Sequence, residues 1–252
     1  MDDVSSLPPP PLLDDACALF LDVDGTLIAF AERPDQVHLL PAVRDTIDAL
    51  SQRLCGALAL VSGRPLEQLD ALFAPLRLPA AGLHGHQLRN DAQARAAMPA
   101  AADTSSFLHA LHQRAAHLAQ ANPGVLVEDK GVSLALHWRS APQVGTSVLD
   151  FARTQISSLT GYRLQLGDHV VEFVPEGSDK GQALEHLLHQ PGFAGRQPVF
   201  VGDDLTDEFG FAAANRLGGW SVLVGRRAGT QARYSLPNIN AVHAWLYDSL
   251  RS

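Results

Sequence analysis

The stretch Leu19-Phe20-Leu21-Asp22-Val23-Asp24-Gly25-Thr26-Leu27 decides the fold of this chain and points to its chemistry. Its first residues are apolar and predict the end of a buried strand, which two carboxylates follow at once. Alternate residues of a strand share a face, so Asp22 and Asp24 are expected to converge just beyond the strand. Two carboxylates held close together repel unless a cation lies between them. The stretch therefore predicts an oxygen-ligated Mg²⁺ site, although Asp, Gly and Thr also suit an ordinary turn.

The composition describes a globular protein with a sizeable core. The chain has 252 residues, of which 46% are hydrophobic, and a formal net charge of −8. This charge argues against a general binder of nucleic acids or anionic membranes. The N-terminus lacks the pattern of a signal peptide, and no apolar run approaches the ~20 residues that span a bilayer. We therefore expect a cytoplasmic, monomeric protein that binds neither nucleic acid nor membrane.

The cysteines and histidines do not indicate a disulfide scaffold or a zinc site. Cys17 and Cys55 are the only cysteines, and both lie in or beside apolar runs. We expect two buried thiols. His84 and His86 are the tightest pair of histidines, and no obvious third ligand accompanies them.

Strands and helices alternate at both ends of the chain, and this pattern predicts a parallel sheet with right-handed crossovers. Strands are expected at 17–23, 57–61, 80–83, 198–201 and 220–224, and helices at 41–54, 66–73, 181–189, 208–215 and 239–250. The middle of the chain differs. Helices are expected there at 105–121 and 143–159, and strands at 125–128, 132–138, 162–166 and 169–174.

These patterns predict an α/β fold, a doubly wound parallel-sheet core with an inserted α+β cap. The Pro-rich residues 1–13 are expected to form a disordered leader. The core is assigned to 14–98 and 175–252, and the cap to 99–174. Residues 86–98 are expected to form a hairpin or a hinge.

Four polar clusters end core strands or open the following helices. They are Asp22 with Asp24, Ser62-Gly63-Arg64, Lys180, and Asp203-Asp204 with Asp207. Ligands of open parallel sheets bind outside the carboxyl ends of the strands, so these clusters are expected to meet in one crevice. Each alone has an ordinary explanation, as a turn, a solvated lysine or a helix cap. Their joint placement favours a site.

The residue types of this crevice suit phosphoryl transfer. A carboxylate can attack phosphorus to give an aspartyl-phosphate. A second carboxyl can protonate the leaving alkoxide and then activate water. Lys180 and the Ser62 hydroxyl would hold the phosphoryl oxygens, and Mg²⁺ would bridge enzyme and phosphate oxygens.

The four clusters resemble the motifs of haloacid-dehalogenase-type phosphatases, in the same order. The resemblance implies that Asp22 is the nucleophile and Asp24 the general acid/base. Asp22, Asp203 and the main-chain carbonyl of Asp24 are then expected to bind Mg²⁺. Asp204 belongs to the same metal site, where it supports metal-bound water, and Asp207 orients Lys180.

More narrowly, the chain resembles the trehalose-6-phosphate phosphatases over roughly residues 17–225. The resemblance rests on Ser62-Gly63-Arg64, Leu83-His84-Gly85, Glu128-Asp129-Lys130-Gly131, His137-Trp138-Arg139, Val171-Glu172 and the run Gly202–Glu208. It implies hydrolysis of a sugar phosphate, trehalose 6-phosphate. The implied substrate-binding residues are Gly25, Thr26, Gly63, Arg64 and His84 in the core, and Glu128, Lys130, Arg139 and Glu172 in the cap.

Alternatives remain at this point. Val174 and Gln87 depart from residues frequent in that family, which weakens the disaccharide assignment more than the phosphatase assignment. Another sugar-phosphate phosphatase, for sucrose phosphate or hexose phosphates, is the nearest rival. A phosphoacceptor signalling domain also uses aspartates, Lys and Mg²⁺, but Asp24 and the cap argue against it. A catalytically silent carbohydrate-binding protein is disfavoured because no site residue is missing. The charged cap residues could also form a surface ion-pair network.

Overall fold

The computed structural model describes residues 7–29, 37–90, 96–97 and 104–251. The chain forms two compact units. We call Met1–Ala97 with Asp179–Ser252 the core, and Met98–Ser178 the cap. The core resumes at Asp179 rather than at 175, because the amide of Glu176 still donates to the Gly161 carbonyl within the cap.

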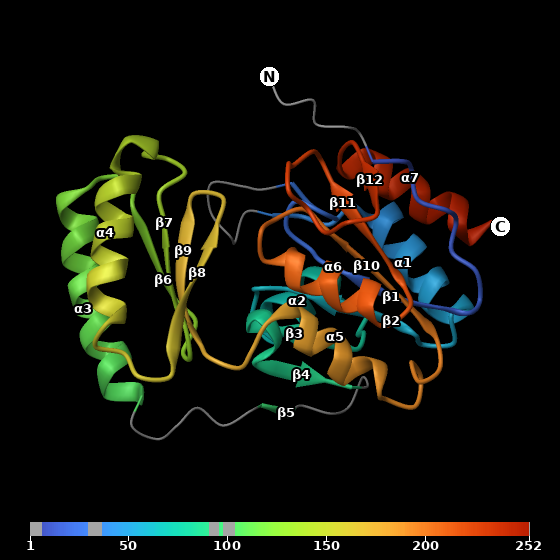
Figure 1. Ribbon diagram of the computed structural model, residues 1–252, viewed down its shortest axis with the longest axis horizontal. Helices are drawn as coiled ribbons and strands as arrows, with labels where there is room; N and C mark the ends of the chain where they lie inside the picture. Colours follow the sequence, from blue (N-terminus) through green and yellow to red (C-terminus); the bar gives the residue numbers. More distant parts are fainter. Residues whose placement is uncertain (1–6, 30–36, 91–95, 98–103, 252) are drawn as a thin grey trace. The chain divides into compact units, whose positions relative to one another are not determined.

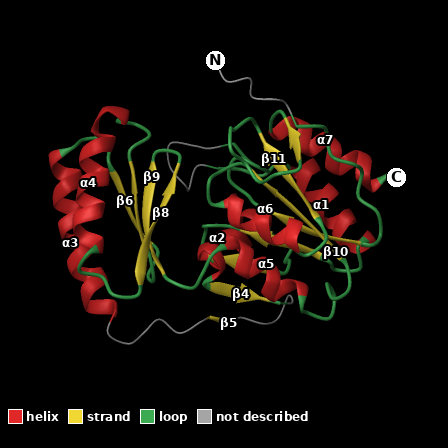
Figure 2. Cartoon of the chain, viewed as in Figure 1, coloured by secondary structure: helices red, strands yellow, loops and turns green. Residues whose placement is uncertain are grey.

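The core is built on an eight-stranded sheet (Figure 2). Its strand order is β12-β11-β10-β1-β2-β3-β4-β5, which is parallel from β12 to β3 and antiparallel beyond. The strands are β1 Cys17–Leu21, β2 Leu58–Val61, β3 Ala80–Gly82, β4 Gln87–Arg89, β5 Ala96–Ala97, β10 Gln197–Gly202, β11 Trp220–Val224 and β12 Tyr234–Leu236. The predicted parallel α/β core is confirmed.

Helices cover both faces of this sheet: α1 and α7 lie on one side, α5 and α6 on the other (Figure 1). The core helices are α1 Pro41–Arg53, α2 Leu66–Phe73, α5 Lys180–Leu188, α6 Asp207–Arg216 and α7 Ile239–Leu250, with a 3-10 turn η2 at Leu83–Gly85. In α1, Pro41 suits the first helical position. Val43, Ile47 and Leu50 recur at helical spacing and are the residues it buries.

The centre of the sheet places the polar loops side by side. Every residue of β1 is buried, as expected of a strand covered on both faces. Phe20 pairs with Phe200 of β10, and the amide of Asp22 donates to the Val201 carbonyl at 2.9 Å. The chain leaves β1 toward β2 and returns at β10, so a crevice lies between the ends of β1 and β10.

The cap is a four-stranded antiparallel sheet, β6-β7-β9-β8, with both helices on one face (Figure 1). Its elements are α3 Thr104–Ala121, β6 Leu126–Asp129, β7 Leu134–His137, η3 Pro142–Val144, α4 Gly145–Ile156, β8 Tyr162–Gly167 and β9 Val170–Pro175. Leu134, Leu136, Val171 and Phe173 belong to one apolar cluster with the helices. The alternate residues of these strands point to the opposite face.

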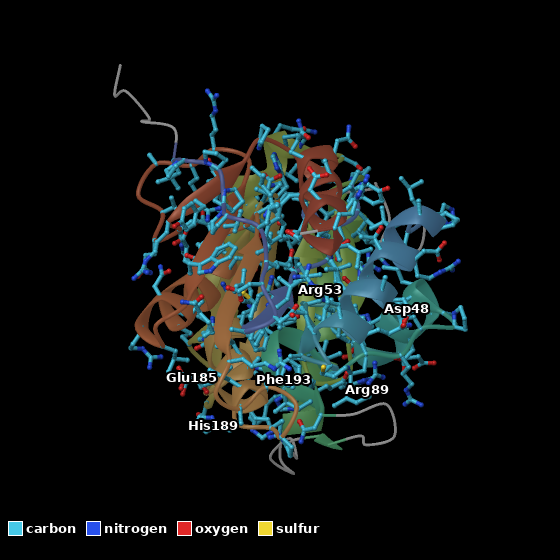
Figure 3. All side chains as sticks on the ribbon, turned by 90° about the vertical axis from the view of Figure 1, so that its right-hand side faces the viewer. Asp48, Arg53, Arg89, Glu185, His189 and Phe193 are labelled. Atoms are coloured by element: carbon cyan, nitrogen blue, oxygen red, sulfur yellow. The ribbon has the colours of Figure 1, made fainter. Side chains whose placement is uncertain are left out.

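Residues 7–13 correct the expectation of a disordered leader. Trp245 donates to the Pro11 carbonyl at 2.8 Å, and Ser235 donates to the Pro8 carbonyl at 3.0 Å. Leu13 is buried in the core, and Arg53, labelled in Figure 3, donates to its carbonyl. The prolines have no N–H to donate to a sheet, but their carbonyls can still accept hydrogen bonds. Residues 1–6 lie outside the described part of the chain.

Three smaller expectations also need comment. Cys17 is buried, but Cys55 is exposed, because it lies beyond the last turn of α1 with a φ of 53°. Strand β12 was not predicted. Residues 86–98 include the antiparallel strands β4 and β5, whereas 91–95 and 98 lie outside the described residues. Across the described ranges, none of the helices has both the length and the apolar character of a membrane span.

Candidate active site

The carboxylate of Asp22 is held from two directions at the end of β1. Lys180 Nζ donates to Asp22 Oδ1 at 2.7 Å, and Thr26 Oγ1 donates to Oδ2 at 3.2 Å. Lys180 is the first residue of α5, a helix capped by the side chain of Asp179. Lys180 and Asp22 lie 158 positions apart in the chain. Both side chains are buried, so their ion pair is shielded from water.

Asp207 and Asp203 complete a carboxylate cluster in which Asp22 and Asp207 are buried and Asp203 is half-buried. Lys180 Nζ also donates to Asp207 Oδ1 at 2.6 Å. One carboxylate oxygen each of Asp22, Asp203 and Asp207 lie within 4.8 Å of one another. Burial and the charge of Asp207 raise the pKa of Asp22 to about 7, and burial and the charge of Asp22 raise the pKa of Asp203 to about 9. The cluster carries more negative charge than Lys180 can balance.

Two glycines allow the loops of this cluster to approach closely. Gly25 has a φ of +82°, and a Cβ there would lie 2.1 Å from Asp203 Oδ2. A Cβ on Gly202 would lie 2.3 Å from the Asp207 carboxyl carbon. Any side chain at either position would push the loop after β1 or the loop after β10 out of place.

The cluster fits a divalent cation. Oδ1 of Asp203 is buried and has no hydrogen-bond partner among the described residues, which is costly unless a cation binds there. Asp207 accepts three hydrogen bonds: its Oδ1 accepts from Lys180, and its Oδ2 accepts from the amides of Asp203 and Asp204 at 2.9 Å each. Asp203, together with the neighbouring carboxylate oxygens of Asp22 and Asp207, could hold the cation. Asp204, predicted at the same metal site, directs Oδ1 to the Leu205 amide instead.

Asp24 is oriented by an arginine of the next strand end. Arg64 donates to both Asp24 carboxylate oxygens at 2.7 Å, and the Arg64 amide donates to Ser62 Oγ at 3.2 Å. The His84 ring lies against Gly63, where a Cβ would be 2.7 Å from His84 Nε2. The structure thus brings Ser62, Gly63, Arg64 and His84 together, and the Arg64 side chain connects this group to Asp24.

The cap carries a second polar cluster. Lys130 Nζ lies 3.1 Å from Glu172 Oε2 and 3.9 Å from Glu128 Oε2. Ser133 Oγ donates to Glu172 Oε1 at 2.6 Å, and His137 Nε2 lies 2.9 Å from Glu128 Oε2. Burial would raise the pKa of Glu128, but His137 and Lys130 outweigh burial and hold that pKa below its usual value. The charges of this cluster are paired.

Strand register places these residues on one face of the cap sheet. Glu128, Ala135, Glu172 and Gln165 are paired in one row across β6, β7, β9 and β8. Ala135 lies between Glu128 and Glu172 in this row, and its small side chain leaves both glutamates within reach of Lys130. Arg139 is placed differently, because it forms an ion pair with Asp168 in the β8–β9 turn at 2.9 Å.

Several residues of these clusters were not among the predicted site residues, although His137 belongs to one of the quoted motifs. Ser133 and His137 hold the two cap glutamates, and Gln165 is buried at the end of their row. Period-2 alternation along β7 and β8 was the available signal, because it assigns these residues to the polar face. In the core, a cavity of about 650 Å³ reaches Gly25 and Asp203 past His38 and His243.

Comparison with known proteins agrees with this geometry. Residues 20–239 match the family model described as trehalose-phosphatase. The trehalose-6-phosphate phosphatase of Escherichia coli K12 is 41% identical over 247 residues, which is 94% of this chain and 87% of that protein. A probable trehalose-phosphate phosphatase of Sinorhizobium fredii is also 41% identical, over 90% of this chain and 85% of that protein.

Among solved structures, the C-terminal domain of Candida albicans trehalose-6-phosphate phosphatase superposes with a TM-score of 0.82. The match covers 97% of this chain and 98% of that one at 21% identity, and it shows a shared fold. The family model spans most of the chain, and the E. coli relative matches nearly its whole length. The chain therefore belongs to the trehalose-phosphatase family, a family of phosphatases with the haloacid-dehalogenase-like fold.

Proposed function

We propose that this protein hydrolyses trehalose 6-phosphate to trehalose and phosphate, with Mg²⁺ as cofactor and an aspartyl-phosphate on Asp22 as intermediate. One observation carries the proposal. A buried carboxylate at a strand end is held by a lysine, beside a second carboxylate whose buried Oδ1 has no hydrogen-bond partner among the described residues. Such a site provides a nucleophile, a fixed positive charge and a place for a cation.

In the first half-reaction, Asp22 attacks phosphorus and the sugar oxygen leaves. Lys180 neutralises charge on the phosphoryl group, and Ser62 holds an equatorial oxygen. Asp24 donates the proton that the leaving alkoxide needs, and Arg64 fixes the direction of that carboxyl group.

In the second half-reaction, water attacks the phosphorus of the aspartyl-phosphate. Asp24, now a carboxylate, takes the proton from that water, and Asp22 is released as a carboxylate. Asp22, Asp203 and the main-chain carbonyl of Asp24 would hold Mg²⁺, which when bound would supply positive charge near the phosphoryl oxygens. Asp207 keeps Lys180 and the β10 loop in place.

We assign sugar recognition to the cap cluster of Glu128, Lys130 and Glu172. Carboxylates accept hydrogen bonds from sugar hydroxyls, and an ammonium donates to them. The pairing of these groups on one sheet face supports this role, because they are already oriented without a ligand. The proposal also places the enzyme in the cytoplasm as a monomer.

Phosphate release tests the proposal directly. Trehalose 6-phosphate, glucose 6-phosphate and sucrose 6-phosphate are compared with and without Mg²⁺. We expect Mg²⁺-dependent release, with kcat/KM for trehalose 6-phosphate well above the other two. A higher kcat/KM for sucrose 6-phosphate would mean that sucrose 6-phosphate, and not trehalose 6-phosphate, is the substrate. An aspartyl-phosphate that persists for minutes would favour a phosphoacceptor domain, since Asp24 would then not be activating water.

A further inference from the structure

The loop that follows β10 is held along both edges of its main chain. The amides of Asp203 and Asp204 donate to Asp207 Oδ2, at 2.9 Å each. The carbonyls of the same two residues accept from Arg227, at 2.8 Å from Nη1 to Asp203 and 3.2 Å from Nη2 to Asp204. Arg227 lies in the connection between β11 and β12, about twenty residues further along the chain.

Arg227 is itself anchored. Its Nη2 forms an ion pair with Glu208 Oε1, and the Gln231 amide donates to Glu208 Oε2 at 2.7 Å. The Arg227 and Glu208 side chains are 21% and 18% exposed, so the contact is mostly screened from water. Asp207 and Glu208 open α6 together. The first turn of that helix therefore holds the loop's amides directly and its carbonyls through Arg227.

Support of the main chain matters at Asp203, because the side chain of this proposed metal ligand is itself poorly supported. Asp203 Oδ1 is buried and has no hydrogen-bond partner among the described residues. Its position then depends on where the Asp203 main chain is held. Groups that orient a metal ligand in this way change metal affinity without touching the metal.

We propose that Arg227 is a positioning residue that fixes the Asp203–Asp204 main chain and so sets the affinity of the enzyme for its divalent cation. Three of its five N–H donors are directed to the loop and to Glu208, as a planar fork allows. This inference rests on the metal in the proposed function, but not on the identity of the sugar.

The chain offers a matched control. Arg226 is the neighbouring residue, carries the same charge and is exposed. Arg226→Ala removes the same charge from the same connection while leaving the loop contacts in place. Arg227→Lys keeps the charge but cannot donate to both carbonyls through a planar fork.

The test is Mg²⁺ binding to metal-free protein, measured by titration calorimetry for wild type, R227A, R227K and R226A. Mn²⁺ binding followed by electron paramagnetic resonance provides a second readout. We expect R227A to weaken Mg²⁺ binding about 10- to 100-fold, R227K to fall between R227A and wild type, and R226A to match wild type. Turnover of R227A should recover as the Mg²⁺ concentration is raised.

The contrary results are specific. An R227A affinity within twofold of wild type would overturn the proposal, even if that variant melted at a lower temperature. Equal weakening in R226A would also overturn it, because charge alone would then explain the effect. If R227A does not fold, R227K decides by the same twofold limit. Loss of Mg²⁺ affinity in R227A alone, in a protein that does not hydrolyse trehalose 6-phosphate, would support Arg227 and refute only the sugar assignment.

Discussion

The carboxylates of the core and those of the cap are organised by opposite electrostatic rules. In the core, Asp22, Asp203 and Asp207 crowd around one lysine, and the pKa values of Asp22 and Asp203 are raised. In the cap, Glu128 and Glu172 share Lys130 and each has a further partner, and the pKa of Glu128 is lowered. The core cluster therefore suits a cation, whereas each cap glutamate already has an ionic or hydrogen-bonding partner, which suits an uncharged, hydroxyl-rich group.

The two clusters also differ in how they are assembled. The core site draws on loops that are up to 185 positions apart, since Asp22 and Asp207 belong to the same cluster. The cap cluster comes from neighbouring strands of one antiparallel sheet, in one register. Damage to a core residue should thus affect the chemical step, and damage to a cap residue should affect the choice of substrate.

The largest effect is expected from Asp22→Asn, which removes the nucleophile and keeps the side-chain volume. Phosphate release should fall below detection on every substrate, because Asn cannot form the aspartyl-phosphate. Circular dichroism should remain that of the wild type. Normal phosphate release by this variant would show that Asp22 is not the nucleophile. The contrast between a core cluster for the chemical step and a cap cluster for substrate choice would then fail.

Without bound metal, the stability of the protein should depend on pH because the core carboxylates repel one another. Burial and neighbouring carboxylates raise the folded-state pKa to about 7 for Asp22 and about 9 for Asp203, from an ordinary 3.8. Between roughly pH 4 and pH 9 the folded metal-free protein thus holds more protons than the unfolded chain, so its free energy of unfolding falls as pH rises. Mg²⁺ replaces those protons. We expect it to raise the melting temperature more at pH 8 than at pH 6.

Thermal melts in chelator and in Mg²⁺ at the two pH values measure this difference. Asp203→Asn serves as the control, because it removes one of the two shifted groups and should flatten the pH slope of the metal-free protein. An Mg²⁺ stabilisation that is the same at pH 6 and pH 8 would contradict the electrostatic account of the core.

A cap variant should separate substrates. Lys130→Ala leaves Glu172 and Glu128 without their ammonium, and we expect kcat/KM for trehalose 6-phosphate to fall about a hundredfold. Turnover of a small ester such as p-nitrophenyl phosphate should change by less than about threefold, because that ester offers no sugar hydroxyls. Steady-state kinetics on both substrates measure the ratio.

Asp150→Ala is a suitable control for the cap variant, since its pair with Arg153 is exposed on α4. Such a surface ion pair contributes little, so both substrates should be turned over as by wild type. Equal losses of Lys130→Ala on the two substrates would show that the cap cluster supports the fold and does not read the sugar.

The smallest effect is expected from Ser133→Ala. Ser133 donates to Glu172 Oε1 at 2.6 Å, and its loss removes one of the contacts that orient this carboxylate, which keeps its ion pair with Lys130. We expect KM for trehalose 6-phosphate to rise about three- to tenfold with little change in kcat, the size of one charge-assisted hydrogen bond. A change in kcat without a change in KM would instead connect this serine to the chemical step.

The layout of the core was predictable because its signals are local. Each strand is an apolar run, and each ends in a polar cluster whose carboxyl-end position follows from parallel topology. Strand β12 escaped detection because its three residues carry no periodicity. Cys55 was misassigned because a helix end, not its apolar neighbours, determines its exposure.

The sequence predicted many of the site residues, but it did not predict which of their side chains contact one another. Asp22, Lys180 and Asp207 were predicted and do meet. The pairing of Arg64 with Asp24, of Ser133 with Glu172 and of Arg227 with the β10 loop depends on side-chain geometry across loops and strands. No motif encodes such contacts, since many polar residues could occupy each position.

The packing of residues 7–13 against β12 and α7 determines the order in which the protein can be completed during synthesis. The cap is one continuous segment, so it can fold once Ser178 has left the ribosome. The core cannot, because β1 pairs with the much later β10, and the segment before β1 needs both Trp245, which donates to the Pro11 carbonyl, and Ser249, which accepts from the Leu13 amide. Asp22, the proposed nucleophile, is thus among the first functional residues made, and its surroundings are among the last to form.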